Sequence, residues 1–476
     1  MHQSQRLAHV LPHYHRLIQS RRNDDTKSPS SAKRTLVSTI KCDARFGRNP
    51  RLNGIGTIVN GIRQSRFARD SAILTVGTLT AQLIGLVAIP ILSRLYSPSQ
   101  FGQLAIFFAV VSIIATMITL RYEVAIFLPK QEGEAISITV LSLVLALSLG
   151  TVFSVLSWIG PTDLKESLGV SSIAEWLPMA VMTGIATAAI SIAMNFLNRR
   201  RAYAAIAKYR VSQSLCAACL GIVLGFIGYS GGLIFAQFIA LIVVASTAIA
   251  QTRPELTNWT RESLVCASRK YSSSPKFLLP TSLMDVATLQ LPVFFIATWF
   301  NTELAGQFNM AWRIITIPIT FIGVSIGQVF IQRFSQSWPD ERAARKLMYK
   351  TWTALALIGA LPTLAVMIFG QRIFSFFLGS SWNEAGSIAE VLAPMILAML
   401  ISSPTSGSYI ALGLQRYSLY FGTASVIHRT ACLYWGAATG DLLAGLFAWT
   451  VCEITAICVY NLIALRAIRL HELNRN

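Results

Sequence analysis

The stretch FGQLAIFFAVVSIIATMITLRYEVAIFLPK, residues 101–130, joins an uninterrupted apolar run to a charged segment and decides the fold class. About 20 helical residues are needed to cross a bilayer core of roughly 30 Å, and the run that starts at Phe101 has this length. At about 1.5 Å per residue, Arg121 and Glu123 lie about 30–33 Å along the helix, where the hydrocarbon ends. The stretch therefore predicts a transmembrane helix followed by a charged cytoplasmic exit.

The composition of the whole chain is that of an integral membrane protein. Of its 476 residues, 53% are apolar and 13% are charged, and the mean hydropathy is positive. Because backbone polar groups in lipid must find partners within their own segment, continuous apolar runs predict helices. We predict an all-α integral membrane protein with about 12 transmembrane helices, at 71–95, 101–123, 135–159, 173–197, 202–227, 231–251, 277–300, 303–325, 350–378, 383–413, 415–437 and 440–465.

Basic residues predict the orientation of these spans. Thirty-five of the 40 Lys and Arg residues fall in the two ends and in alternate connections, whereas the opposite connections hold only Arg94, Lys165 and Arg372. The positive-inside rule then places both termini in the cytoplasm. The formal net charge of +19 is spread over loops that face anionic lipid, so membrane lipids are the expected partners and nucleic acid is not.

A weak internal repeat predicts how the helices are grouped. RLYSPSQFGQLAIFF (94–108) resembles ATWFNTELAGQFNMA (297–311), which sets Gly102 and Gln103 on Gly306 and Gln307. Because each half would hold six spans, corresponding helices run in the same direction. This predicts two six-helix lobes related by a parallel pseudo-repeat around a central cleft. The expected domains are a basic, disordered cytoplasmic segment (1–70), an amino-terminal lobe (71–251), a basic cytoplasmic linker (252–276), a carboxy-terminal lobe (277–465) and a cytoplasmic tail (466–476).

Charged residues inside the spans are candidates for function, because each costs about 2.5–3.5 kcal/mol at the bilayer centre. Asp285 and Arg313 are predicted to meet near the midplane, either as a structural ion pair or with Arg313 binding an anionic substrate in a wet cavity and Asp285 holding or releasing it. Arg429, beside His428, and Glu453 form a second couple with the same two interpretations. Asp285 and Glu453 are also the candidates for coupling to protons or sodium.

The charged exit and the prolines complete the candidate set. In a continuous helix Arg121 and Glu123 would point about 200° apart, so we expect them not to pair with each other. Arg121 would lie among lipid phosphates, or one of the two would face the cytoplasmic mouth of the cleft. Pro90, Pro280 and Pro292 are expected either as ordinary kinks or as hinges of cavity-lining helices. No nucleophile, nucleotide or metal motif occurs, so no catalytic residue, cofactor or metal site is predicted.

RLYSPSQFGQLA, followed by LRYEVAIFLPK and a short acidic E-x-E turn, resembles the amino-terminal half of bacterial polysaccharide exporters, the oligosaccharide flippases of O-antigen and exopolysaccharide assembly. The resemblance extends over roughly residues 70–465. It implies membership of the multidrug, oligosaccharidyl-lipid and polysaccharide exporter superfamily, with alternating access between two lobes. It further implies a transporter in the bacterial inner membrane that carries a polyprenyl-diphosphate-linked oligosaccharide from the cytoplasmic to the outer leaflet, with other polysaccharide-assembly membrane proteins as further partners.

Two other classes of function remain open. A cation-coupled drug or metabolite antiporter of the same superfamily would share the fold and would be indicated by an acidic cleft. A membrane polysaccharide polymerase or ligase would carry a long outer loop, whereas the longest outer connection predicted here is about a dozen residues.

Overall fold

The computed structural model describes residues 50–159, 171–257, 259–317 and 319–475, which are almost entirely helical and contain no strand. The chain divides into two compact units, Met1–Arg69 and Asp70–Asn476. Of the segment predicted to be disordered (1–70), residues 1–49 lie outside the described ranges. Residues 50–70 instead form the first part of helix α3 (Pro50–Leu95), where no proline interrupts the chain before Pro90.

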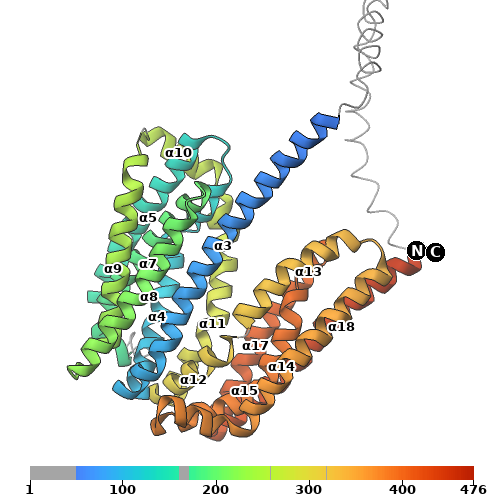
Figure 1. The fold of residues 1–476 in the computed structure, drawn as a ribbon. Coiled ribbons are helices and arrows are strands. Elements are labelled where there is room, and N and C mark those ends of the chain that lie inside the picture. Colours follow the sequence, from blue (N-terminus) through green and yellow to red (C-terminus); the bar gives the residue numbers. More distant parts are fainter. Residues whose placement is uncertain (1–49, 160–170, 258, 318, 476) are drawn as a thin grey trace, which may run out of the picture. The chain divides into compact units, whose positions relative to one another are not determined.

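The first six predicted spans are confirmed as helices (Figure 1). Helix α7 packs against α4, α5 and α9, and α8 packs against α9. These helices are α3 (Pro50–Leu95, of which Ala72–Leu95 is long and apolar enough to cross a membrane), α4 (Pro98–Ile118), α5 (Glu132–Ile159), α7 (Leu177–Arg199), α8 (Tyr203–Phe226) and α9 (Gly232–Thr252).

The carboxy-terminal half forms a second group in which α15 packs against α14 and α18, and α17 packs against α11 and α18. The helices of this group are α11 (Leu279–Trp299), α12 (Thr302–Ile315), α13 (Val324–Ser337), α14 (Glu341–Leu378), α15 (Asn383–Ser402), α16 (Ser408–Ala411), α17 (Gln415–Thr439) and α18 (Leu442–Arg475). We keep the terms amino-terminal and carboxy-terminal lobe for the two groups; their exact boundaries stay a prediction.

Ten helices in the described residues are long and apolar enough to span a membrane, against the twelve predicted. The eighth predicted span is divided into α12 and α13, of 14 residues each, with the π-helical turn η5 (Ile319–Gly323) between them. The eleventh predicted span is α17, which has 25 residues but carries Arg416, His428 and Arg429, which lower its hydropathy. The two predicted spans that are not among the ten are therefore a helix interrupted by a π-helical turn and a helix with several charged residues. Both features make a span hard to recognise by its apolar length.

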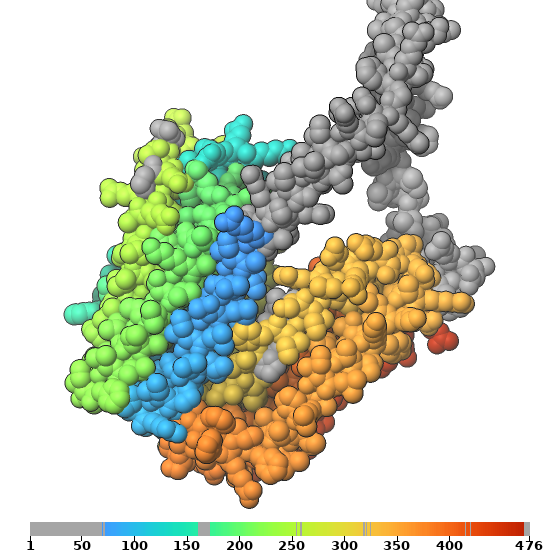
Figure 2. Space-filling model, in the orientation of Figure 1, coloured from blue at the N-terminus to red at the C-terminus, as the bar shows by residue number. Residues whose placement is uncertain are grey.

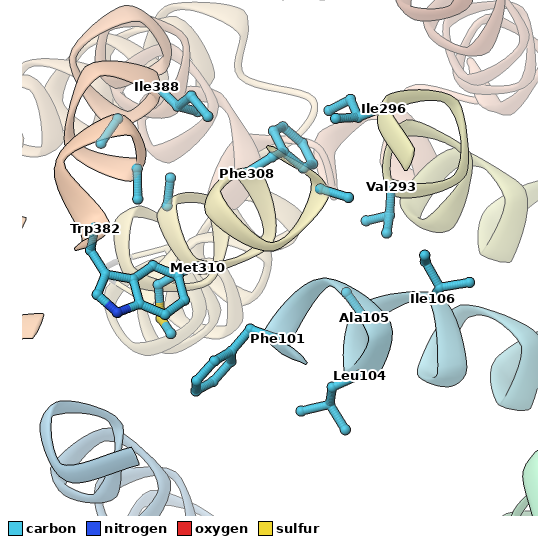
Figure 3. Packing of buried hydrophobic residues seen from close by; sticks show 14 of the residues in the cluster. Phe101, Leu104, Ala105, Ile106, Val293, Ile296, Phe308, Met310, Trp382 and Ile388 are labelled. Carbon is cyan, nitrogen blue, oxygen red and sulfur yellow. The ribbon is translucent and has the colours of Figure 1, made fainter. Parts of the chain in front are cut away.

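The two lobes meet where α4 crosses α12. Both helices begin with a side-chain cap, from Ser97 on α4 and from Asn301 on α12. Burial in lipid gives helices no hydrophobic gain on association, so close backbone approach and tight packing hold such a crossing together. The buried cluster in Figure 3 surrounds it and includes residues of α4, α11, α12 and α15, among them Phe101, Ala105, Val293, Ile296, Phe308 and Ile388.

We call the end of the bundle at which α3 ends and α4, α12 and α15 begin the closed end, because hydrogen bonds join the lobes there. Ser93 of α3 donates its hydroxyl to the Leu378 carbonyl at 3.0 Å, and the Trp382 indole donates to the Ser93 carbonyl at 2.9 Å. The Trp382 ring also lies edge-on to Phe101, with ring centroids 5.1 Å apart. This end of the interface between the lobes is therefore sealed by polar and apolar contacts together.

The predicted linker 252–276 carries a helix of its own, α10 (Arg261–Lys270), between the short turns η3 (Arg253–Glu255) and η4 (Ser274–Leu278). Helix α10 packs against α5. Lys270 pairs with Glu134, and the Ser263 hydroxyl lies 3.0 Å from that of Ser137. The linker is thus fastened to the amino-terminal lobe.

Candidate functional site

A cavity of about 700 Å³ lies between the lobes. It extends along α3 from Leu92, beside the closed end, to Thr78, which is about 20 Å at the helical rise. Figure 2 shows the surface hollowed between α3 and α13. The walls of the cavity come from α3, α4, α8, α9, α11 and α12, and from η5. The residues that line it are Thr78, Ala81, Gln82, Gly85, Leu86, Ala88, Ile89, Leu92, Phe101, Leu104, Arg210, Gln213, Ser214, Ala217, Ala218, Leu233, Ala236, Gln237, Leu289, Gln290, Asn309, Trp312, Arg313, Thr316, Ile317 and Phe321.

The polar lining of the cavity consists of two arginines, five side-chain amides and several hydroxyls, and no carboxylate belongs to this lining in the described residues. The amides are Gln82, Gln213, Gln237, Gln290 and Asn309. Because both charged residues are cations, the cavity favours an anionic guest. The amides can donate and accept hydrogen bonds at the same time, which suits hydroxyl groups.

Arg313 is one of the two cations of the cavity. It lies on α12, on the same face as Asn309 and Thr316, and its side chain is exposed to the cavity. Its Nη2 atom would be 3.6 Å from a Cβ built on Gly85, so the guanidinium reaches across to α3 of the other lobe. The prediction that Arg313 faces a cavity therefore agrees with its position, and its role in binding substrate stays a prediction.

Asp285 lies on α11 with an exposed side chain and does not line the cavity. No ion pair or hydrogen bond joins it to Arg313 in the part of the chain that the structure describes. Of the two interpretations of this couple, the structural ion pair is therefore not formed in this conformation.

Arg210 is the cavity cation that sequence reasoning missed. It was counted among the basic residues of a cytoplasmic connection, although the predicted span 202–227 contains it. Helix α8 begins at Tyr203, so Arg210 lies two turns inside the helix. Its Nη1 atom donates to the Thr78 hydroxyl at 2.7 Å, which joins α8 to α3. The signal was present in the spacing of Arg210, Gln213 and Ser214, which lie three and four residues apart and so share one helix face.

Arg429 and Glu453 form a buried, two-point ion pair between α17 and α18. Arg429 donates from Nη2 to Oε1 of Glu453 at 2.8 Å and from Nε to Oε2 at 3.0 Å. His428 Nε2 lies 2.9 Å from the same Oε2, and the Trp449 indole donates to it at 3.2 Å. Arg429, His428 and Glu453 do not line the large cavity, so this arrangement agrees with the structural interpretation of the couple.

The expectation that Arg121 and Glu123 cannot pair was wrong. Arg121 Nη1 lies 3.0 Å from Oε1 of Glu123, whose side chain is 2% exposed. The expectation assumed one continuous helix, but α4 ends at Ile118, and Leu120 and Arg121 adopt left-handed φ values of 48° and 61°. That reversal brings the two side chains to the same side.

The segment around this pair connects several elements and does not line the cavity. Asn195 of α7 donates to the Glu123 carbonyl at 3.1 Å, and the Tyr122 hydroxyl donates to the Ser268 carbonyl of α10 at 3.0 Å. Burial raises the pKa of the Tyr122 phenol, so the hydroxyl keeps the proton that it donates. The assignment of Arg121 and Glu123 to the cytoplasmic mouth stays a prediction.

The three predicted hinge prolines occupy different positions in their helices. Pro90 and Pro292 lie inside α3 and α11, whereas Pro280 lies in the first turn of α11, directly after the π-helical turn η4. Because Pro292 has no amide hydrogen, the Thr288 carbonyl four residues earlier loses its helical partner. Arg429 Nη1 donates to that carbonyl at 3.3 Å, so a neighbouring helix supplies the missing donor.

Comparison with known proteins agrees with this architecture. Residues 91–387 match the profile of the polysaccharide biosynthesis protein family. The succinoglycan biosynthesis transport protein ExoT of Rhizobium meliloti (strain 1021) is 22% identical over 389 residues, which are 80% of this chain and 76% of that protein. The lipopolysaccharide biosynthesis protein WzxC of Escherichia coli (strain K12) is 20% identical over 135 residues, which are 28% of this chain and 27% of that protein.

Solved structures of two transporters share the fold. The lipid II flippase MurJ in an inward closed conformation has a TM-score of 0.65 at 12% identity, and the match covers 85% of this chain and 90% of that one. An inward-facing multidrug resistance MATE family transporter has a TM-score of 0.60 at 17% identity, over 82% of this chain and 95% of that one. These likenesses show the fold of a multi-helix membrane transporter.

Proposed function

Since the chain belongs to the polysaccharide biosynthesis protein family, within the exporter superfamily named above, we propose that it flips a polyprenyl-diphosphate-linked oligosaccharide across the bacterial inner membrane. The diphosphate and the sugars would pass through the cavity between the lobes while the polyprenyl tail stays in lipid. Movement from the cytoplasmic to the outer leaflet would follow from alternate opening of the cavity at its two ends.

The observation that supports this proposal best is the placement of Arg210 and Arg313 in a cavity whose lining includes no acid among the described residues. A diphosphate that leaves water loses the hydration of roughly two negative charges, which is costly unless hydrogen-bonded cations replace it. Arginine offers two parallel N–H donors that match phosphate oxygens. Arg210 comes from the amino-terminal lobe and Arg313 from the carboxy-terminal lobe, so each lobe contributes one cation to the cavity through which the diphosphate would pass.

The other polar groups of the cavity suit the sugar part of the same substrate. Side-chain amides such as Gln213 and Asn309 can pair with sugar hydroxyls in either direction. The ring of Trp312 lines the cavity and stacks on Trp449, with ring centroids 5.7 Å apart, which gives it a fixed position. A rigid aromatic face beside several amides is a suitable surface for a carbohydrate.

The direction of transport follows from the predicted orientation. If the basic connections are cytoplasmic, the closed end faces outward and the cavity of this conformation is accessible from the cytoplasm. With the cell interior negative, moving each negative charge outward gains up to about 2.3 kcal/mol per 100 mV. The membrane potential would therefore contribute to export of a diphosphate carrying roughly two charges.

The two rival classes are less consistent with the cavity. A drug antiporter of this superfamily was expected to show an acidic cleft, and the charged residues that line the cavity are arginines. A polymerase or ligase is disfavoured because the relatives and structural neighbours described above are transporters and flippases.

The proposal is tested by replacing Arg313 in a bacterium that carries this gene on its chromosome. We expect Arg313→Ala to reduce surface polysaccharide at least tenfold while the amount of protein in the membrane stays normal, and Arg313→Lys to retain part of the export because it keeps the charge. Arg372→Ala is the matched control, since Arg372 lies on α14 away from the cavity lining. Normal export by Arg313→Ala would contradict the assignment of this cation to the substrate.

A further inference from the structure

The hydrogen bonds of His428 require one more proton than a neutral histidine carries. Its Nδ1 atom lies 2.9 Å from the Ala424 carbonyl oxygen, and its Nε2 atom lies 2.9 Å from Oε2 of Glu453. Both neighbours are oxygen acceptors, so both ring nitrogens must act as donors. A neutral imidazole has a single N–H, and only the imidazolium or a protonated Glu453 can complete both contacts.

The surroundings of Glu453 place the extra proton on the ring. Its Oε2 atom already accepts from Arg429 Nε at 3.0 Å and from the Trp449 indole at 3.2 Å, and its Oε1 atom accepts from Arg429 Nη2 at 2.8 Å. Every neighbour of the carboxylate is therefore an N–H donor, which stabilises the ionised form. An ionised Glu453 then leaves His428 as the group that holds the proton.

The charged and titratable groups around this cluster come from three helices. Helix α17 contributes His428 and Arg429, α18 contributes Glu453, and α11 contributes only the Thr288 carbonyl. The other titratable side chains nearby on these helices, Asp285, Cys432 and Cys452, form no hydrogen bond with the cluster in the described residues; Cys432 and Cys452 contact each other at 3.9 Å. The cluster thus holds two positive charges and one negative charge.

Arg429 connects this cluster to the point at which Pro292 interrupts the hydrogen bonds of α11. The guanidinium that binds Glu453 also donates from Nη1 to the Thr288 carbonyl, the one left without a helical partner by Pro292. The next two residues of α11, Leu289 and Gln290, line the large cavity. A change in the charge of the cluster therefore acts on the donor that binds the Thr288 carbonyl, one residue from the cavity wall.

We propose that His428, Glu453 and Arg429 form a binding site for one proton within the membrane-spanning part of the carboxy-terminal lobe, linked through Arg429 to the Thr288 carbonyl that Pro292 leaves without a helical partner in α11. Loss of the proton leaves the His428 ring able to keep only one of its two hydrogen bonds, either to Glu453 or to the Ala424 carbonyl. Arg429 is then the sole positive charge facing the carboxylate. Because the same guanidinium binds Glu453 and the Thr288 carbonyl, Arg429 is the group through which the change in charge reaches α11.

The protonation state of the His428 ring can be measured directly by nitrogen NMR. The sample is the full-length protein labelled with ¹⁵N-histidine, in nanodiscs between pH 5 and 9. The difference between wild type and His428→Gln isolates the His428 ring, and His471→Gln is the control. We expect a doubly protonated ring in the wild type at neutral pH, and loss of the doubly protonated form at neutral pH in Glu453→Gln. A neutral ring with a single tautomer at every pH in the wild type, or a doubly protonated ring at neutral pH in Glu453→Gln, would overturn the proposal.

The link to α11 is tested by electron-spin distance measurements between labels on genetically encoded amino acids at Met284 of α11 and Leu357 of α14, which are both exposed. We expect the distance distribution of the wild type to change with pH. It should stay fixed in His428→Gln and in Pro292→Ala, where a restored amide N–H can bind the Thr288 carbonyl. A pH-dependent change that persists in both variants would overturn the link.

Discussion

Gly102 and Gly306 occupy reciprocal positions at the crossing of α4 and α12. A Cβ atom on Gly102 would lie 1.9 Å from the Thr302 carbonyl oxygen, and a Cβ atom on Gly306 would lie 1.9 Å from the Pro98 carbonyl oxygen. Each glycine thus meets the backbone four residues before its counterpart in the predicted repeat. The reciprocity is the contact that two like lobes make when their equivalent helices pack against each other.

Backbone atoms occupy the space that a Cβ atom would need at both glycines. We therefore expect Gly102→Ala to force α4 and α12 apart and to separate the two lobes at the closed end. Spin labels at Phe226 and Phe376, exposed residues of α8 and α14, should then show a longer mean distance than in the wild type. Gly133→Ala is the matched control, since nothing lies within 4 Å of a Cβ at that helical glycine. Equal distances in Gly102→Ala and the wild type would contradict the crossing described here.

The Arg121 and Glu123 pair predicts a specific pattern of stability changes. Removing Arg121 leaves an uncompensated carboxylate that is 2% exposed, whereas Arg121 itself is 31% exposed. We expect Arg121→Ala to lower the free energy of unfolding by about 2–3 kcal/mol, a value reduced for the partial exposure of Arg121. The free energy of unfolding should fall by less in the double variant Arg121→Ala/Glu123→Gln than in Arg121→Ala, because the buried charge of Glu123 is also removed.

This pattern can be measured by thermal or denaturant unfolding in detergent, with Lys130→Ala as a control at an exposed position of the same loop. Additive losses in the double variant would mean that the two side chains do not stabilise each other.

The attachment of α10 to the amino-terminal lobe should depend on pH only in strongly basic solution. The hydrogen bond to Glu134 raises the pKa of Lys270 above its usual value of 10.5. A raised lysine pKa means that the contribution of the pair is fully present below about 10.5 and is lost as the pH rises through the higher folded-state value. Protease cleavage within residues 252–276 should therefore stay constant between pH 7 and 9 and increase above about 10.5.

The variant Lys270→Met should show the increased cleavage already at pH 8, since it lacks the charge at every pH. Arg269→Met, which removes the neighbouring cation, is its control. Equal cleavage of the two variants at pH 8 would show that the pair with Glu134 does not fasten the linker.

Glu453 is expected to be the most sensitive charged residue of the carboxy-terminal lobe. Glu453→Ala would leave the buried Arg429 and the half-buried His428 without their carboxylate, and breaking a buried pair on one side costs about 3–5 kcal/mol. We expect a large drop in the melting temperature in detergent and less protein in the membrane. Glu384→Ala, at an exposed position in the first turn of α15, should leave both unchanged.

Apolar length and loop charge predicted most of the membrane-spanning helices, because both reflect the bilayer and need no knowledge of packing. Counting the helical rise also predicts the depth of Arg313, and this depth stays a prediction. Depth does not say which way a side chain faces, since each residue turns the helix by 100°. For this reason the sequence could not decide whether Asp285 pairs with Arg313, and the structure shows no ion pair between them among the residues that it describes, although α11 and α12 are neighbours.

One other feature depended on backbone conformation that the sequence does not display. The left-handed residues Leu120 and Arg121 carry no glycine or asparagine signal, so the end of α4 was placed five residues too late and the ion pair with Glu123 was excluded. Arg210 was missed for a different reason: it lies inside the predicted span 202–227, as it does in α8, but it was counted with the basic residues of the preceding connection.

Helix α11 belongs mechanically to both halves of the molecule. Helix α11 follows directly on η4, which contacts η1 of the amino-terminal half. It packs against α4 of the amino-terminal half and against α17 of the carboxy-terminal half. Since α10 is fastened to α5, little slack remains between the docked linker and the start of α11. Rocking of one half against the other would then be absorbed along α11 itself, and its pivot would lie in this helix and not in the connecting segment.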